Sequence, residues 1–222
     1  MSKRIFLLPG FGEDAHNFEE LVSYIKGYTI IGVDYRPVLN KFIFPVITRK
    51  QFAKRLIEYY QITPEDKLIG HSMGGYFSFQ VRELQGNDIC MIAAFSDPGK
   101  VKHLLPQFPR FSQIAALTGF VKSGYSKKYL MNRVKEEHYR IILSNVLNNF
   151  KRFTNIQLAL MLEMSYEEKI DSFLPNPLRI HDRADRVITQ PDEEYIQVSG
   201  GHFCLNLYPE ETYNAMKEFL HS

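Results

Sequence analysis

The sequence has few cysteines, little net charge and no long hydrophobic run, and each of these absences excludes a class of protein. Its two cysteines, Cys90 and Cys204, are too few for a disulfide framework, so we expect both to be reduced and structural. The 27 Lys and Arg residues against 25 Asp and Glu give a net charge of +2, which is too small to indicate a nucleic-acid partner. No apolar segment approaches the roughly 18–20 residues that a membrane-spanning helix needs, so no membrane partner is expected.

The amino terminus has only the beginning of a secretory signal. Lys3 and Arg4 precede the apolar run Ile5–Leu8, but Pro9 and Gly10 then end it. Because a secretory core needs roughly 7–15 apolar residues, this run predicts a buried strand, and we expect a cytoplasmic protein. The rest of the composition, with 45% hydrophobic and 23% charged residues among 222, is that of a folded globular chain.

Short apolar segments alternate with segments of helical spacing over most of the chain. Segments that are apolar without polar alternation are typical of strands buried on both faces of a parallel sheet. Six segments have this character: Arg4–Pro9, Tyr28–Asp34, Lys67–Gly70, Ile89–Phe95, Leu178–His181 and Glu194–Val198. The alternation predicts an α/β protein, with a mainly parallel sheet of about six strands flanked by helices.

The stretch from Pro98 to Asn176 breaks this alternation. It has helical spacing without a strand pattern, and a structureless loop of that length is implausible in a compact domain. We therefore predict a single domain of residues 1–222, with a core of residues 1–97 and 177–222 and a helical cap inserted at residues 98–176.

The predicted cap is basic. It contains 12 Lys or Arg against 6 Asp or Glu, a net charge of +6, so the remaining chain carries −4. A solvated helix surface is the simpler interpretation. A surface that faces the substrate and favours an anionic or polar ligand is the alternative.

The segment Gly70–Gly75, with the sequence GHSMGG, contains the pattern G-x-S-x-G between a predicted strand and a predicted helix. A serine on so sharp a turn is held in a strained backbone conformation, with its hydroxyl exposed above the sheet, and flanking glycines relieve clashes there. This context predicts that Ser72 is a nucleophile.

Acyl transfer also creates a negatively charged oxygen that needs backbone N–H donors. Met73, directly after the serine, is expected to supply one donor at the helix start. The second is expected from the loop after the first strand, where Gly10 and Gly12 let the backbone approach closely and Phe11 is the candidate donor. Both glycines are also candidates for lining the site.

A serine hydroxyl needs a base, and seven histidines compete for that role. His202 follows the last predicted strand, at the edge of the sheet where ligands bind in open α/β folds, and is the predicted base. His71 should point away from the serine across the turn, which favours a structural role; with His16 and Phe203 it is a possible lining residue. The remaining histidines are expected to be ordinary core or surface residues: His103, His138, His181 and His221.

The base in turn needs an acid that fixes its tautomer. Asp185 lies in the loop after the strand Leu178–His181, 113 residues after Ser72 and 17 before His202. Asp97, after the strand Ile89–Phe95, is the alternative acid, because that position can also reach the histidine. Asp182 is a nearer competitor that is still close to the strand end.

These pieces, in this order, resemble the α/β-hydrolase superfamily over nearly the whole chain. The matching pieces are Pro9–Gly12, Gly70–Gly75, His181 with Asp185 and Val187, and Gly200–Phe203. The resemblance implies a triad of Ser72, His202 and Asp185, an oxyanion hole from the backbones of Phe11 and Met73, and a helical cap inserted after the sixth of the family's usual eight strands.

The sequence also departs from the family pattern. The first strand begins at Arg4, so the two leading strands of the family are missing and a trimmed sheet is implied. Pro9 replaces a histidine that usually precedes the loop glycine, which removes a side chain but no backbone donor. The apolar stretch Lys41–Val46 could line an acyl pocket, although covering the sheet is the preferred interpretation.

We therefore expect an enzyme, a serine hydrolase acting on an ester or thioester of a small-molecule acyl substrate. No metal or organic cofactor is expected, since the sequence has neither a His/Cys cluster with metal-ligand spacing nor a phosphate-binding glycine motif. Acyltransferase, amidase and carbon–carbon hydrolase or lyase chemistry on the same triad are alternatives, and a non-catalytic ligand-binding protein or receptor is the alternative of another class.

Overall fold

The computed structural model describes residues 3–42, 47–102 and 110–222. Within these residues the chain forms a sheet of six strands whose neighbours are all parallel, in the order β2-β1-β3-β4-β5-β6. The strands are β1 (Arg4–Leu8), β2 (Thr29–Gly32), β3 (Lys67–His71), β4 (Ile89–Ile92), β5 (Leu178–His181) and β6 (Ile196–Gln197). The predicted six-stranded parallel sheet is confirmed.

The direction in which the chain moves across the sheet reverses between β1 and β3. From β1 the chain crosses to β2 on one side of it, whereas β3 pairs with the other side of β1. The loops that follow β1 and β3 therefore leave the sheet in different directions, and ligands of open α/β sheets bind at such a switch point. In the β1–β3 register the last residue of β1, Leu8, lies opposite Gly70, one residue before β3 ends, so the two loops start within one residue of each other along the sheet.

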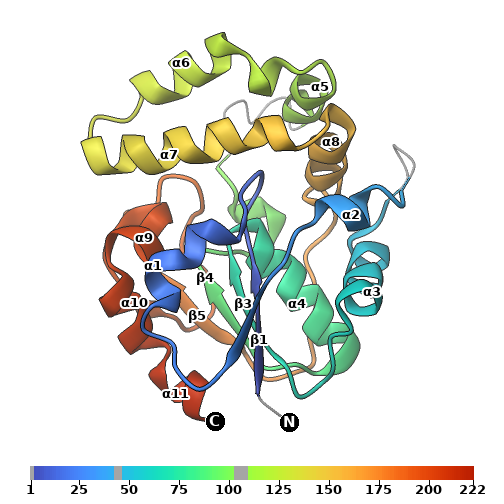
Figure 1. The fold of residues 1–222 in the computed structure, drawn as a ribbon, viewed down its shortest axis with the longest axis vertical. Coiled ribbons are helices and arrows are strands. Elements are labelled where there is room, and N and C mark those ends of the chain that lie inside the picture. The colour runs from blue at the N-terminus through green and yellow to red at the C-terminus, as the bar shows by residue number, and fades with distance from the viewer. Residues whose placement is uncertain (1–2, 43–46, 103–109) are drawn as a thin grey trace.

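Helices cover both faces of the sheet (Figure 1). One face carries α2 (Arg36–Leu39), α3 (Arg49–Tyr60) and α4 (Met73–Gln85), and the other carries α1 (Glu19–Val22), α9 (Cys204–Leu207), α10 (Pro209–Ala215) and α11 (Lys217–His221). Alternate residues of β1 serve the two faces, because successive side chains of a strand point in opposite directions. Phe6 and Leu8 pack in the core cluster on the α4 side, and Ile5 and Leu7 pack in the cluster on the α10 side.

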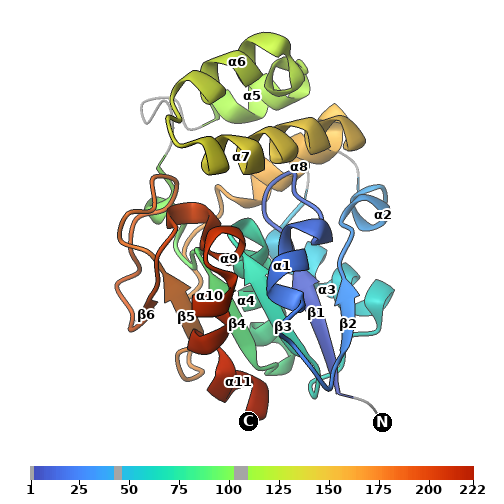
Figure 2. The same cartoon turned by 60° about the vertical axis from the view of Figure 1, so that its left-hand side comes forward.

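In the described part of the segment predicted as a cap lie four α-helices: α5 (Phe111–Leu117), α6 (Gly124–Asn132), α7 (Glu137–Asn149) and α8 (Asn155–Met164). Figures 1 and 2 show α7 running across the carboxyl ends of the strands, with α6 farther from the sheet. We call residues 110–176 the helical cap segment. His103 and residues 43–46 of the apolar stretch are outside the described residues.

Among the residues that the structure describes, no helix combines the length and the apolar character that crossing a membrane requires.

Candidate active site

Ser72 stands on a strained turn between β3 and α4. Its φ is 54° and its ψ is −122°, a conformation that residues with a Cβ rarely adopt. The flanking glycines are sterically required: a Cβ on Gly74 would lie 1.9 Å from the carbonyl oxygen of Leu8, and a Cβ on Gly70 would lie 2.5 Å from the backbone of Gly75. The sequence GHSMGG thus places a serine on a sharp turn pressed against β1, as its pattern predicts.

His202 and Asp185 form a buried pair at the carboxyl end of the sheet. His202 lies in the 3₁₀ helix η5 (Gly201–Phe203), and its Nδ1 is 2.9 Å from Asp185 Oδ2. The other carboxylate oxygen, Oδ1, accepts hydrogen bonds from the backbone N–H groups of Val187 (2.7 Å) and Ile188 (3.0 Å). Burial alone would raise the pKa of Asp185, but His202 and the two N–H donors outweigh it and hold that pKa below its ordinary value. Asp185 is therefore ionised and accepts a hydrogen bond from Nδ1–H of His202, and in the neutral ring this leaves Nε2 without a proton.

The competing carboxylates have other partners. Asp97 caps the 3₁₀ helix η2 (Pro98–Lys100), where it accepts the N–H of Gly99 at 2.8 Å. Asp182 accepts the N–H of Gly201 at 2.6 Å and so fixes the loop that carries His202. Of the three aspartates considered from the sequence, Asp185 is the one that the structure pairs with the histidine.

The structure brings His202 beside the Ser72 turn. Its ring centroid lies 5.0 Å from that of His71, and its backbone oxygen is 2.8 Å from His71 Nε2. Within the described residues no hydrogen bond joins Ser72 Oγ to His202. Such bonds are often long in a free enzyme and tighten when substrate binds.

The loop after β1 is fixed from two sides. The hydroxyl of the buried Tyr35 donates to the carbonyl oxygen of Pro9 at 2.8 Å, and the N–H of Gly10 donates to Glu13 Oε2 at 2.8 Å. In the part of the chain that the structure describes, the N–H groups of Phe11 and Met73 donate to no protein acceptor. Met73 is the first residue of α4, where the helix leaves backbone N–H groups unpaired.

The helical cap segment packs directly on this loop. Gly12 has a φ of +67°, and a Cβ there would lie 2.1 Å from the Phe150 ring. Phe11 meets the same ring edge-on, with centroids 5.3 Å apart. On the other side of the site, Tyr139 of α7 packs on Phe203 with centroids 4.8 Å apart. Aromatic contacts therefore connect the cap segment to the loops of both Phe11 and His202.

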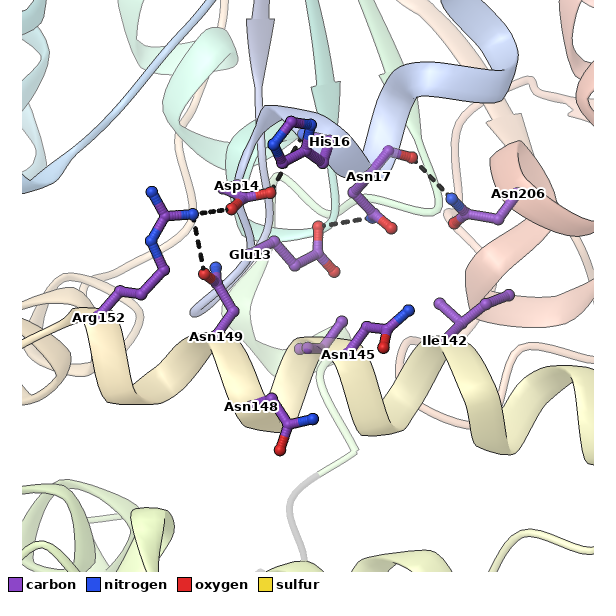
Figure 3. A pocket seen from close by; sticks show the side chains of 11 residues that line it. Glu13, Asp14, His16, Asn17, Ile142, Asn145, Asn148, Asn149, Arg152 and Asn206 are labelled. Carbon is purple, nitrogen blue, oxygen red and sulfur yellow. Dashed lines mark hydrogen bonds and ion pairs between the residues drawn. The ribbon is translucent and has the colours of Figure 1, made fainter.

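His16 is not brought to Ser72. Its side chain is exposed and lines a separate pocket of about 490 Å³ between the 3₁₀ helix η1 (Ala15–Phe18) and α7. Figure 3 shows this pocket, where Asp14 and Arg152 form an ion pair and several asparagines face the opening. Neither Ser72 nor His202 is among its described lining residues.

Sequence reasoning missed Glu13. This carboxylate is buried, and its Oε2 lies 2.8 Å from Nδ1 of His71, which is 58 residues farther along the chain. His71 was expected to be structural, but neither its contact with Glu13 nor its contact with His202 was predicted. The only signal was an acidic residue in a glycine-containing loop, which usually indicates a solvated turn.

Neither cysteine is a rival nucleophile. Both are free and buried, and burial raises the pKa of Cys204 to about 12 and that of Cys90 still higher. The described residues contain no group of three or more His, Cys, Asp or Glu side chains that could hold a metal ion.

Comparison with solved structures identifies the fold of the chain. No protein-family model matches the sequence, and no curated protein matches it. Solved structures do match over the full chain: a hydrolase from Oleispira antarctica (TM-score 0.76, 13% identity, 100% of this chain and 92% of the other) and an enol-lactonase from Burkholderia xenovorans (0.75, 15%, 100% and 92%). The chain has the α/β-hydrolase fold.

A thermophilic esterase from Thermogutta terrifontis is similarly close, with a TM-score of 0.74, 16% identity, and coverage of 100% of this chain and 90% of the other. At such low identities the likeness is one of fold, and it confirms the resemblance to α/β hydrolases that the motifs indicated. Within this fold, Ser72 follows β3, Asp185 follows β5 and His202 follows β6. Because these strands are parallel, all three residues lie at the same end of the sheet, where the strands have their carboxyl ends.

Proposed function

We propose that the protein is a serine hydrolase that cleaves an ester or thioester of a small acyl compound. The observation that carries this proposal is the strained Ser72 turn lying beside the buried His202–Asp185 pair. A serine hydroxyl becomes a useful nucleophile only beside an oriented base, and this arrangement supplies both the base and its orienting acid.

Acylation begins when Ser72 Oγ attacks the carbonyl carbon of the substrate and His202 Nε2 takes the hydroxyl proton. Asp185 accepts a hydrogen bond from Nδ1–H of His202 and stabilises the imidazolium that forms. The carbonyl oxygen becomes an oxyanion, which the N–H groups of Met73 and Phe11 bind. His202 then donates its proton to the departing alcohol or thiol, and the acyl group stays on Ser72.

Deacylation repeats these steps with water. His202 Nε2 takes a proton from a water molecule as its oxygen attacks the acyl carbon, and the same N–H groups bind the second oxyanion. Collapse of this intermediate breaks the bond to Ser72 Oγ, which recovers the proton from His202. The products are a carboxylic acid and the alcohol or thiol, and the enzyme returns to its starting state.

The structural neighbours support this choice of chemistry. Those described above are a hydrolase, an esterase and an enol-lactonase. The names of the last two both refer to ester substrates, since a lactone is a cyclic ester. Phe11, whose N–H is a proposed oxyanion donor, packs edge-on against the buried ring of Phe150, so the surroundings of this donor include apolar side chains.

Intact-mass labelling with a fluorophosphonate tests the proposal. We expect one adduct on the wild type and none on Ser72→Ala. Ser78→Ala is the matched control, because Ser78 lies in α4, which begins directly after Ser72, and its buried hydroxyl donates to the carbonyl of Gly75. An adduct that survives in Ser72→Ala, or a folded wild type without an adduct, would contradict the assignment. Ester and thioester panels of different acyl size then define the substrate.

A further inference from the structure

A charged pair is buried between the β1 loop and the Ser72 turn. The side chain of His71 is fully buried and that of Glu13 is 4% exposed, and their Nδ1 and Oε2 atoms are 2.8 Å apart. Nε2 of His71 lies 2.8 Å from the backbone oxygen of His202. None of the steps described above uses Glu13 or His71.

The hydrogen-bond partners define the charge of this pair. A backbone oxygen can only accept, so His71 Nε2 carries a proton. Oε2 of Glu13 accepts from the N–H of Gly10 (2.8 Å) and from Asn17 Nδ2 (2.9 Å), as expected of an ionised carboxylate. Asn17 Nδ2 is farther from Nδ1 of His71 (3.4 Å), whereas Nδ1 is 2.8 Å from Oε2, so Nδ1 donates to the carboxylate. His71 is then an imidazolium that faces a carboxylate.

The electrostatics of the surroundings agree with this assignment. Burial alone would lower the pKa of His71, but the charge and hydrogen bond of Glu13 and the His202 carbonyl outweigh it, so the pKa lies above its ordinary value. Burial alone would raise the pKa of Glu13, but His71 and the N–H of Gly10 outweigh it, so that pKa lies below its ordinary value. The charge of Asp185 also acts to raise the pKa of His71, and the ring of His202 lies 5.0 Å from that of His71.

The pair touches all three parts of the proposed site. Glu13 holds the N–H of Gly10, one residue before the proposed oxyanion donor Phe11. His71 is the residue before Ser72, and its second nitrogen holds the backbone of His202. A single ion pair thus connects three loops that are far apart in the sequence.

We propose that Glu13 and His71 are positioning residues whose ion pair holds the oxyanion loop, the Ser72 turn and the His202 loop in the geometry that acyl transfer requires. This inference rests on the proposed hydrolase function. The pair also has an electrostatic role. When His202 takes the serine proton, a second cation lies at His71, with the ring centroids 5.0 Å apart, and the carboxylate of Glu13 compensates it.

A small carboxylate from solution can take the place of the Glu13 side chain when that side chain is removed. It lines the pocket of about 490 Å³ shown in Figure 3, so a Glu13→Ala variant leaves a space that is continuous with this pocket. A small carboxylate such as formate can enter there and face His71.

Kinetics of four variants test the proposal. We expect Glu13→Gln and His71→Gln each to lower kcat by about 10- to 100-fold with KM changed less than about threefold, since misplacing reacting groups by about 1 Å has such an effect. The double variant should be no worse than the worse single variant, because the two residues act as one unit. Asp14→Asn is the matched control in the same loop: asparagine still caps η1, so kcat should stay within about twofold.

Chemical rescue separates a charge requirement from a merely structural one. Formate should restore the kcat of Glu13→Ala in a saturable way and should leave His71→Gln and the wild type unchanged. A folded Glu13→Gln variant with the wild-type kcat, or fully additive losses in the double variant, would overturn the proposal.

Nitrogen-15 NMR of histidine-labelled wild type tests the pair without any turnover. We expect both ring nitrogens of His71 to carry protons at pH 7, and a neutral ring there would overturn the ion pair. This measurement needs no variant, so it stands even where a substitution prevents folding. If fluorophosphonate gives no adduct while His71 is doubly protonated, the hydrolase proposal fails and the ion pair itself remains.

Discussion

Replacing Asp185 by asparagine tests the orientation of His202 through a constraint that the structure imposes. An asparagine side chain has the same shape as aspartate, but one of its polar atoms is an NH₂ group that only donates. Oδ1 of Asp185 accepts two backbone N–H groups, from Val187 and Ile188, so an oxygen must stay at that position. The NH₂ group is therefore forced toward His202, at the position of Oδ2.

The consequence for His202 is a change of tautomer. Nδ1 facing an NH₂ group must accept a hydrogen bond, so the ring proton moves to Nε2, the atom that should take the proton of Ser72. We expect kcat to fall by about 10⁴-fold, as in serine proteases with the equivalent change, which is about 5 kcal/mol in activation free energy. The free energy of unfolding should fall by only about 1 kcal/mol, because the two backbone hydrogen bonds are kept.

The assay is steady-state hydrolysis of the best ester from the panel, with thermal unfolding measured on the same samples. Asp97→Asn is the matched control, because asparagine still caps η2 and the activity should be unchanged. A loss below about tenfold in folded Asp185→Asn would refute the tautomer argument. A severe loss in Asp97→Asn would instead make Asp97 the orienting acid.

Three further predictions concern stability. Gly74→Ala should lower the free energy of unfolding by about 3 kcal/mol or more, because its Cβ would lie 1.9 Å from the oxygen of Leu8; an unchanged denaturant midpoint would contradict this contact. Ser72→Gly should abolish labelling but be about 1 kcal/mol more stable than Ser72→Ala, because glycine adopts a φ of 54° without strain. If Ser72→Gly melted at a lower temperature than Ser72→Ala, strain at the turn would be refuted. The difference in unfolding free energy between wild type and Glu13→Gln should be largest between pH 4.5 and 6.5, the ordinary pKa values of Glu and His. The raised pKa of His71 adds stability that is lost as the pH rises through that pKa. The lowered pKa of Glu13 adds stability that is lost as the pH falls through that pKa. A gap in unfolding free energy that is flat with pH would argue against the ion pair.

The strands were predictable because their signal is local. The segment Lys67–Gly70 was predicted from its apolar run, and β3 is Lys67–His71, buried throughout. Predictions were less accurate at the edges: Glu194–Val198 became the two-residue strand Ile196–Gln197. An edge strand pairs on one side only, so fewer of its apolar residues are fixed in extended conformation.

The candidate site was also largely visible in the sequence. Ser72 belongs to a contiguous pattern, and Asp185 and His202 each follow a predicted strand, where parallel strands bring their carboxyl ends to one edge. Glu13 was not visible, because its role depends on a partner 58 residues away and on burial in a loop that looks solvated.

The sequence by itself determined the local elements: the apolar strands, the helical character of the cap segment and the sharp glycine-flanked turn at Ser72, since each depends on residues close together in the chain. The tertiary structure alone decided the strand order β2-β1-β3-β4-β5-β6, the hydrogen bond between His202 and Asp185, and the pairing of Glu13 with His71. These depend on which distant segments become neighbours, and a hydrogen bond or ion pair forms only where packing brings two groups to about 3 Å and excludes water from them.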